Sequence, residues 1–133
     1  EPFRGSYTLK VALGEHASRR IVVPAESTFD DLALFVLRAF RFDDEHLYEF
    51  RLRDQYAARR TLSDPCYSEA EDEYADALTL GAAHLFPQAF IELQYGFGSD
   101  WRFHVYVEGL NASASVAKPA VLEREGRAPR QYD

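Results

Sequence analysis

The sequence contains no methionine and one cysteine, Cys66. A single cysteine cannot form a disulfide within the chain, so we expect a reducing, cytoplasmic compartment. No apolar run approaches the ~20 residues that span a bilayer, and no membrane association is expected. The first residues lack the apolar segment of a signal peptide, and the missing methionine leads us to expect that the chain begins downstream of a native start or has been processed or trimmed.

Basic residues are missing from a long central stretch. No Lys or Arg occurs between Thr61 and Trp101, whereas this stretch holds eight Asp and Glu residues. The whole chain has a net charge of −7, so the remainder sums to +1. Because non-specific nucleic-acid affinity comes mainly from Lys and Arg that neutralise phosphates, this balance disfavours nucleic-acid binding but leaves room for a local basic site.

The composition is that of an ordinary globular protein, with 47% hydrophobic and 28% charged residues among 133. This length fits one domain, which we expect to span 1–133. Most of the acidic excess lies in 64–76, beside Pro65, and predicts a solvent-exposed acidic loop. We expect a polar C-terminal tail at 111–133.

Hydrophobic and polar residues alternate in several short runs, as in strands with one buried face. The runs at 7–13 and 19–23 are separated by a short turn and predict an antiparallel hairpin. A run at 47–53 predicts a further strand. The runs at 91–97 and 101–107, joined by a short loop that contains glycine, predict a second hairpin.

A segment between two of these strands has helical spacing. Ser27 or Thr28 can cap its start, and Asp30 and Asp31 place negative charge in its first turn. A shorter segment at 79–86 predicts one or two further helical turns. The apolar face of the main helix consists of Leu32, Phe35, Val36, Ala39 and Phe40.

Together these elements predict an α+β fold with the order hairpin, helix, strand, loop with a short helix, hairpin. We expect a mixed or antiparallel sheet of about five strands, with one main helix packed on a face, in a β-grasp-like layout. The pattern leaves the strand order open.

Several short motifs follow one another in a characteristic order. They are Tyr7-Thr-Leu-Lys-Val, Arg19-Arg20-Ile-Val-Val-Pro, His46-Leu-Tyr-Glu-Phe and Tyr95-Gly-Phe-Gly-Ser-Asp-Trp. In these motifs the chain resembles the plasmid pRiA4b ORF-3-like family over roughly residues 7–110. The resemblance implies that this is an uncharacterised protein. It also implies relatives whose genes occur on plasmids, as passengers of insertion sequences and in bacterial chromosomes.

The chain also departs from the family pattern. Ala33 stands where relatives commonly have a histidine, and Gly96 and Ser99 replace aspartates beside Phe-Gly. Phe103 replaces another histidine, while His104 falls on the other face of the predicted strand. If these polar positions form a site in relatives, much of that site is missing here.

Residues that bind metals or act as nucleophiles are few and scattered. Zinc sites use closely spaced Cys and His pairs, and His46, His84, His104 and Cys66 form none. Cys66 lies in the acidic segment, which raises the pKa of a thiol and lowers its reactivity. No phosphate-binding glycine loop or serine nucleophile motif occurs. We therefore expect no metal, no cofactor and no catalytic residues.

Two groups of residues are candidate binding sites. Arg19 and Arg20 form a positive patch with Arg51 and Arg53 if the second and third strands lie close together. Such a patch suits a phosphate or an acidic peptide. The alternative is an ordinary solvated sheet face whose arginines pair with nearby glutamates.

The second group surrounds the turn of the last hairpin. Asp100, Trp101 and His104 lie there, with His46 and Tyr48 expected nearby, and together they suggest a ligand pocket. In the alternative interpretation, Trp101 fills the core and Asp100 accepts hydrogen bonds from turn amides.

We interpret the chain as a non-catalytic interaction module with a protein partner. One alternative is a nucleic-acid-binding protein associated with mobile elements, which only the genetic location of relatives favours. A second alternative is an enzyme with a pocket near the last hairpin. The oligomeric state, the ligand and the partner's identity stay open.

Overall fold

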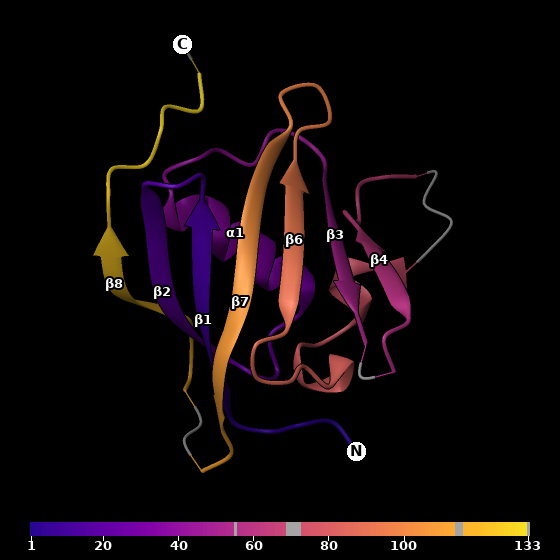
Figure 1. Cartoon of the computed structure of the whole chain (residues 1–133). Helices are drawn as coiled ribbons and strands as arrows, with labels where there is room; N and C mark the ends of the chain where they lie inside the picture. Colours follow the sequence, from indigo (N-terminus) through magenta and orange to yellow (C-terminus); the bar gives the residue numbers. More distant parts are fainter. Residues whose placement is uncertain (55, 69–72, 114–115, 133) are drawn as a thin grey trace.

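Strands dominate the structure, a computed structural model that describes residues 1–54, 56–68, 73–113 and 116–132 (Figure 1). The strands are β1 (Ser6–Leu13), β2 (Ala17–Pro24), β3 (Tyr48–Arg53), β4 (Arg59–Ser63), β5 (Glu73–Tyr74), β6 (Phe90–Tyr95), β7 (Trp101–Asn111) and β8 (Ala120–Glu125). All eight form one sheet in the order β5-β4-β3-β6-β7-β1-β2-β8. Neighbouring strands are antiparallel, except that β4 and β5 are parallel, so the sheet is mixed.

One α-helix, α1 (Phe29–Ala39), occurs in the described part of the chain and lies behind the sheet in Figure 1. Thr28 caps it: its hydroxyl accepts the Asp31 N–H, and the Asp31 carboxylate accepts the Thr28 N–H. Phe29 packs edge-on against Phe50 of β3, with ring centroids 5.3 Å apart. The helix and the sheet side that faces it, the inner face, therefore share one hydrophobic core.

The predicted fold class is wrong. The α+β arrangement of about five strands, with one main helix packed on a face, is replaced by an eight-stranded mixed sheet with a single short α-helix among the described residues. Seven strand spacings of ~4.8 Å make the sheet ~34 Å wide, whereas an 11-residue helix is only ~16 Å long. The β-grasp-like layout is also wrong, because β1 lies between β2 and β7 and is antiparallel to both.

The prediction missed β4, β5 and β8, and their sequences explain why. Only Val121 of β8 is even partly buried, so this strand has no apolar face to alternate with a polar one. β5 has only two residues, and at the end of β4 the buried apolar Leu62 is followed by a polar residue that is also buried, Ser63. All three strands lie at or beside an edge of the sheet. Fewer side chains are buried there, so the alternation of apolar and polar residues in the sequence is weakest.

Other predictions from local pattern are confirmed. β1 and β2 form the first hairpin and β6 and β7 the last, both antiparallel. The segment at 79–86 contains a short 3-10 helix, η2 (Gly81–Ala83). The acidic loop at 64–76 stays a prediction, because residues 69–72 lie outside the described residues; its described part contains β5 and the start of a second 3-10 helix, η1 (Ala75–Ala77).

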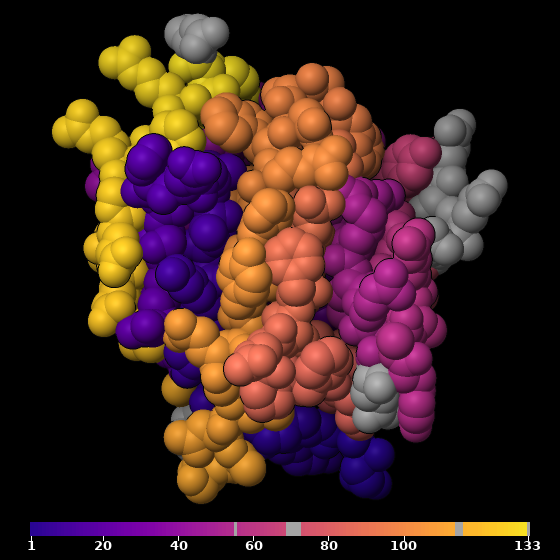
Figure 2. Space-filling model, viewed as in Figure 1, coloured from indigo at the N-terminus to yellow at the C-terminus, as the bar shows by residue number. Residues whose placement is uncertain are grey.

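The sheet side away from α1, the outer face, is polar. Figure 2 shows the strands of this face directly at the molecular surface, and none of the described helices crosses it. Along β3, Tyr48, Phe50 and Leu52 are buried on the inner face, while Arg51 and Arg53 point to the outer face. No helix in the described residues is long and apolar enough to cross a membrane.

Candidate functional site

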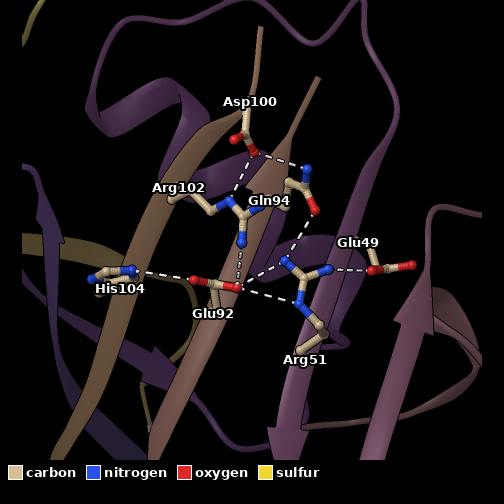
Figure 3. Close-up of polar contacts among 7 residues, drawn as sticks. All are labelled: Glu49, Arg51, Glu92, Gln94, Asp100, Arg102 and His104. Carbon is tan, nitrogen blue, oxygen red and sulfur yellow. Dashed lines mark hydrogen bonds and ion pairs between the residues drawn. The ribbon is translucent and has the colours of Figure 1, made fainter. Parts of the chain in front are cut away.

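A network of charged and amide side chains occupies the middle of the outer face (Figure 3). Strand alternation turns its members outward, and strand register aligns them: Arg51 of β3 lies opposite Glu92 of β6, which lies opposite His104 of β7. The members of this outer-face network are Glu49, Arg51, Glu92, Gln94, Asp100, Arg102 and His104.

Glu92 is the centre of the network. Its Oε1 accepts hydrogen bonds from Arg51 Nη2 at 2.7 Å and from Arg102 Nη1 at 3.0 Å. Its Oε2 lies 3.3 Å from His104 Nε2. The Glu92 side chain is only 20% exposed, so one carboxylate on the sheet surface organises residues from three strands.

Two further contacts join this centre to the turn of the last hairpin. Arg51 donates to Glu49 and, at 3.0 Å, to Gln94 Oε1. Asp100 Oδ1 accepts from Gln94 Nε2 at 2.9 Å and from Arg102 Nε at 2.7 Å. The network thus extends without a break from β3 to the residue that precedes β7.

The arginines hold Glu92 and Asp100 of the network in their ionised form. Burial by itself raises the pKa of Glu92, but the hydrogen bond and charge of Arg51, with Arg102 and His104, bring that pKa below its ordinary value. The hydrogen bond from Arg102 is the largest effect on Asp100 and lowers its pKa as well. A carboxylate that stays ionised so readily is a poor general acid or base near neutral pH.

The structure does not bring the four arginines of the predicted patch together. β6, β7 and β1 separate β3 from β2, which places Arg51 and Arg53 four strand spacings, ~19 Å, from Arg20. Arg20 forms ion pairs with Glu108 at 2.8 Å and Glu123 at 2.9 Å on the outer face.

Arg19 lies on the opposite side of the sheet from Arg20. It is buried, and its guanidinium carbon lies 4.9 Å from the ring centroid of Phe40. Its Nη1 donates to the carbonyls of Ser18, Glu125 and Gly126. Adjacent residues in a strand face opposite ways, and Arg19 therefore ties β8 to β2 and takes no part in a surface patch.

The residues predicted around the last hairpin also separate into different environments. Trp101 is partly buried and packs on Phe42, with ring centroids 4.9 Å apart, as in the core interpretation. Tyr48 lies on the inner face and donates its hydroxyl to Asp30. Asp100 and His104 belong to the outer-face network. The described contacts of the Asp100 carboxylate are with the side chains of Gln94 and Arg102, and not with the turn amides of the alternative interpretation.

His46 and Trp101 do line one pocket, of about 470 Å³, at the end of the sheet. His46 Nε2 lies 3.2 Å from the hydroxyl of Tyr132, which donates to Asp43 at 2.8 Å and has its pKa raised to about 12 by that hydrogen bond. Asp43 also accepts from Gln131 Nε2 at 2.8 Å. The sequence analysis missed this cluster, since its residues are up to 89 positions apart.

A groove of about 740 Å³ lies at the other end of the outer face. Arginines from the β3–β4 hairpin form one wall, and the segment that leads into β6 forms the other. We call it the arginine groove; its side chains include Arg51, Arg53, Arg59, Arg60, Phe86 and Phe90. Of these, the sequence analysis identified only Arg51 and Arg53, because β4 was not predicted.

Comparison with known proteins places the sequence of this chain in a family. The sequence profile of the plasmid pRiA4b ORF-3-like proteins matches residues 6–131. The chain belongs to this family. A search of curated proteins gave no match.

The fold of this chain is also found in a solved structure. The crystal structure of a protein of unknown function from Methanosarcina mazei Go1 is similar, with a TM-score of 0.81 at 22% sequence identity. The similarity covers 98% of this chain and 74% of that chain. At this identity the similarity supports a shared fold and no more.

Two departures from the family pattern lie in the core of this pRiA4b ORF-3-like protein. Ala33 and Phe103 are fully buried, and Phe103 packs against Phe40 and Phe42. These positions therefore contribute apolar packing here. Across the described residues, no group of three or more His, Cys, Asp or Glu side chains is arranged to share a metal ion.

Proposed function

We propose that this pRiA4b ORF-3-like protein is a non-catalytic binding module that uses the outer face of its sheet to bind a protein partner. The observation that carries the proposal is the mixture of ordered charges and exposed aromatic rings on that face. Phe90 is 46% and Tyr106 is 41% exposed, and their ring centroids are 5.3 Å apart. Exposed aromatics beside arginines are typical of the central part of protein interfaces.

The ion pairs support binding over catalysis. Glu92 and Asp100 are ionised and already hydrogen-bonded to arginines, so neither is free to take up or release a proton near neutral pH. The same contacts restrict the long side chains before any partner arrives, which lowers the entropy that association loses.

The ion pairs also favour a protein over a nucleic acid. Arg20, Arg51 and Arg102 each have carboxylate partners on this face. Nucleic-acid affinity grows with the number of phosphates that cations neutralise, and cations already paired with carboxylates are poorly available for that purpose.

An affinity capture with the full chain as bait tests this proposal. Wild-type bait should retain a stoichiometric partner from an extract of the source cell, and added salt should weaken the complex. The double variant Phe90→Ala/Tyr106→Ala should lose the partner, whereas Leu122→Ala, an exposed residue of β8, should keep it. Failure of folded wild-type bait to retain any partner, or equal capture by all three baits, contradicts the proposal.

A further inference from the structure

The arginine groove has an unusual balance of charge. Among the described residues, four arginines line it against one carboxylate, Glu92. Arg51 pairs with Glu49 and Glu92, and Arg60 Nε donates to Glu73 at 2.9 Å. These two arginines are therefore neutralised within the fold.

Arg53 and Arg59 are different. They are exposed and lie directly opposite each other in the β3–β4 register, where like charges destabilise a strand pair. Arg53 Nη1 donates to the carbonyl of Ala57 at 2.8 Å, and no carboxylate in the described part of the chain forms an ion pair with either guanidinium. A bound anion would relieve the repulsion that the fold leaves in place.

The opposite wall of the groove is aromatic. Phe86 is 42% and Phe90 is 46% exposed, so two phenylalanine rings remain in contact with water beside two arginines that have no ion-pair partner among the described residues. Water-exposed rings of this size are favourable contacts for apolar side chains. The groove therefore presents complementary surfaces to a ligand that carries both carboxylates and apolar groups.

We infer that the arginine groove binds an extended acidic segment of a protein partner. Carboxylates of the segment pair with Arg53 and Arg59, whose planar guanidinium groups can each donate two parallel hydrogen bonds to a carboxylate. Apolar side chains of the segment contact Phe86 and Phe90. The inference rests on the proposed function and names the chemistry of the partner.

The charge distribution favours this ligand over a nucleic acid. A polyanion gains affinity from many phosphate contacts, and here two adjacent cations lack partners within the described fold while the whole chain carries a charge of −7. A short acidic segment needs only the local positive charge of the groove, because more distant surface charges are screened at physiological salt.

Fluorescence anisotropy with the full chain tests the inference. The probe is a short fluorescein-labelled peptide of Glu, Asp and Leu; the comparison probes are the same peptide with Lys in place of its acids, and an oligo(dT) strand. The acidic peptide should bind, and Arg53→Glu/Arg59→Glu should weaken it by about tenfold, since two exposed ion pairs become repulsions. Phe86→Ala/Phe90→Ala should also weaken binding. Arg38→Glu is the control: it makes the same charge change at one site on α1 and should leave the binding of the acidic peptide unchanged.

Three outcomes overturn the inference: no binding of the acidic peptide, equal binding by wild type and the Arg53/Arg59 variant, or tighter binding of oligo(dT) that the same variant abolishes. The last result assigns the groove to a nucleic acid.

If the acidic peptide does not bind but the Phe90→Ala/Tyr106→Ala bait still loses a captured partner, only the groove assignment is wrong. If no partner is captured by any bait, the proposed function itself has failed.

Discussion

Replacement of Glu92 by glutamine isolates the role of charge in the outer-face network. Glutamine has nearly the same shape and keeps hydrogen-bonding capacity, but it removes the negative charge that Arg51, Arg102 and His104 share. The variant leaves two arginines and a histidine around a neutral side chain. We expect the folded state to lose stability at neutral pH.

The size of the loss follows from the exposure of the partners. The contact between Arg51 and Glu92 joins side chains that are 34% and 20% exposed, which is intermediate between a surface pair and a buried one. Such a pair contributes about 1 kcal/mol to the free energy of unfolding. Arg102 and His104 are 43% and 42% exposed and add less, because water and salt screen them.

The loss should depend on pH in a defined direction. The pKa of Glu92 is lower in the folded protein than its ordinary value, so its stabilising effect is complete above the pKa of an unfolded glutamate, about 4.3. The effect disappears as the pH falls through the lower folded pKa, where the proton neutralises the carboxylate in wild type too. The difference between wild type and Glu92→Gln should therefore shrink toward zero in acid.

Urea unfolding with linear extrapolation, repeated from neutral to acidic pH, measures this difference. Glu26→Gln is the matched control, because Glu26 is exposed and forms no ion pair within the described residues. Equal stabilities of wild type and Glu92→Gln at neutral pH would refute the reasoning. A difference that persists at the same size in acid would refute it as well, since that result cannot arise from the charge.

Two other predictions concern backbone geometry and use the same unfolding assay. Thr28→Ala should destabilise the protein by about 1 kcal/mol because it removes the capping box of α1, whereas Thr28→Ser should be nearly neutral; equal loss in both contradicts the role of the hydroxyl. Gly14 and Gly126 both have positive φ, but a Cβ at Gly14 meets open space and one at Gly126 would lie 1.6 Å from the carbonyl oxygen of His16. Gly14→Ala should cost about 1 kcal/mol and Gly126→Ala clearly more, and equal costs would show that the close approach is absent.

The elements that sequence reasoning found are those with a strong local pattern. The hairpins of β1–β2 and β6–β7 alternate between apolar and polar residues, and Thr28 with Asp31 marks the start of α1. β8 was missed because five of its six residues are exposed, so its sequence resembles a polar tail. Its place in the sheet depends on pairing with β2 and on the contacts of Arg19 with Glu125 and Gly126, more than 100 residues away.

The candidate site was predicted in part for the same reason. Alternation correctly turned Arg51, Glu92 and His104 away from the core, yet it did not show that β3 lies beside β6. The predicted patch depended on β2 and β3 lying close together, which they do not, and it grouped Arg19 with Arg20 although neighbouring strand residues face opposite sides. The sequence pattern therefore placed each arginine on a sheet face without showing which carboxylates lie beside it.

The order of residues along this chain establishes which side of each alternating strand is apolar, where the helix begins and which segment carries the acidic excess. These properties depend on neighbours a few positions apart, because strand and helix periods are short. Which strands become neighbours depends on pairings across the whole chain, such as β1 with β7 and β3 with β6. That long-range pairing assembles the outer-face network around Glu92. It also places Arg53 and Arg59 opposite each other, so a chain with a net charge of −7 carries a local group of positive charges in the arginine groove.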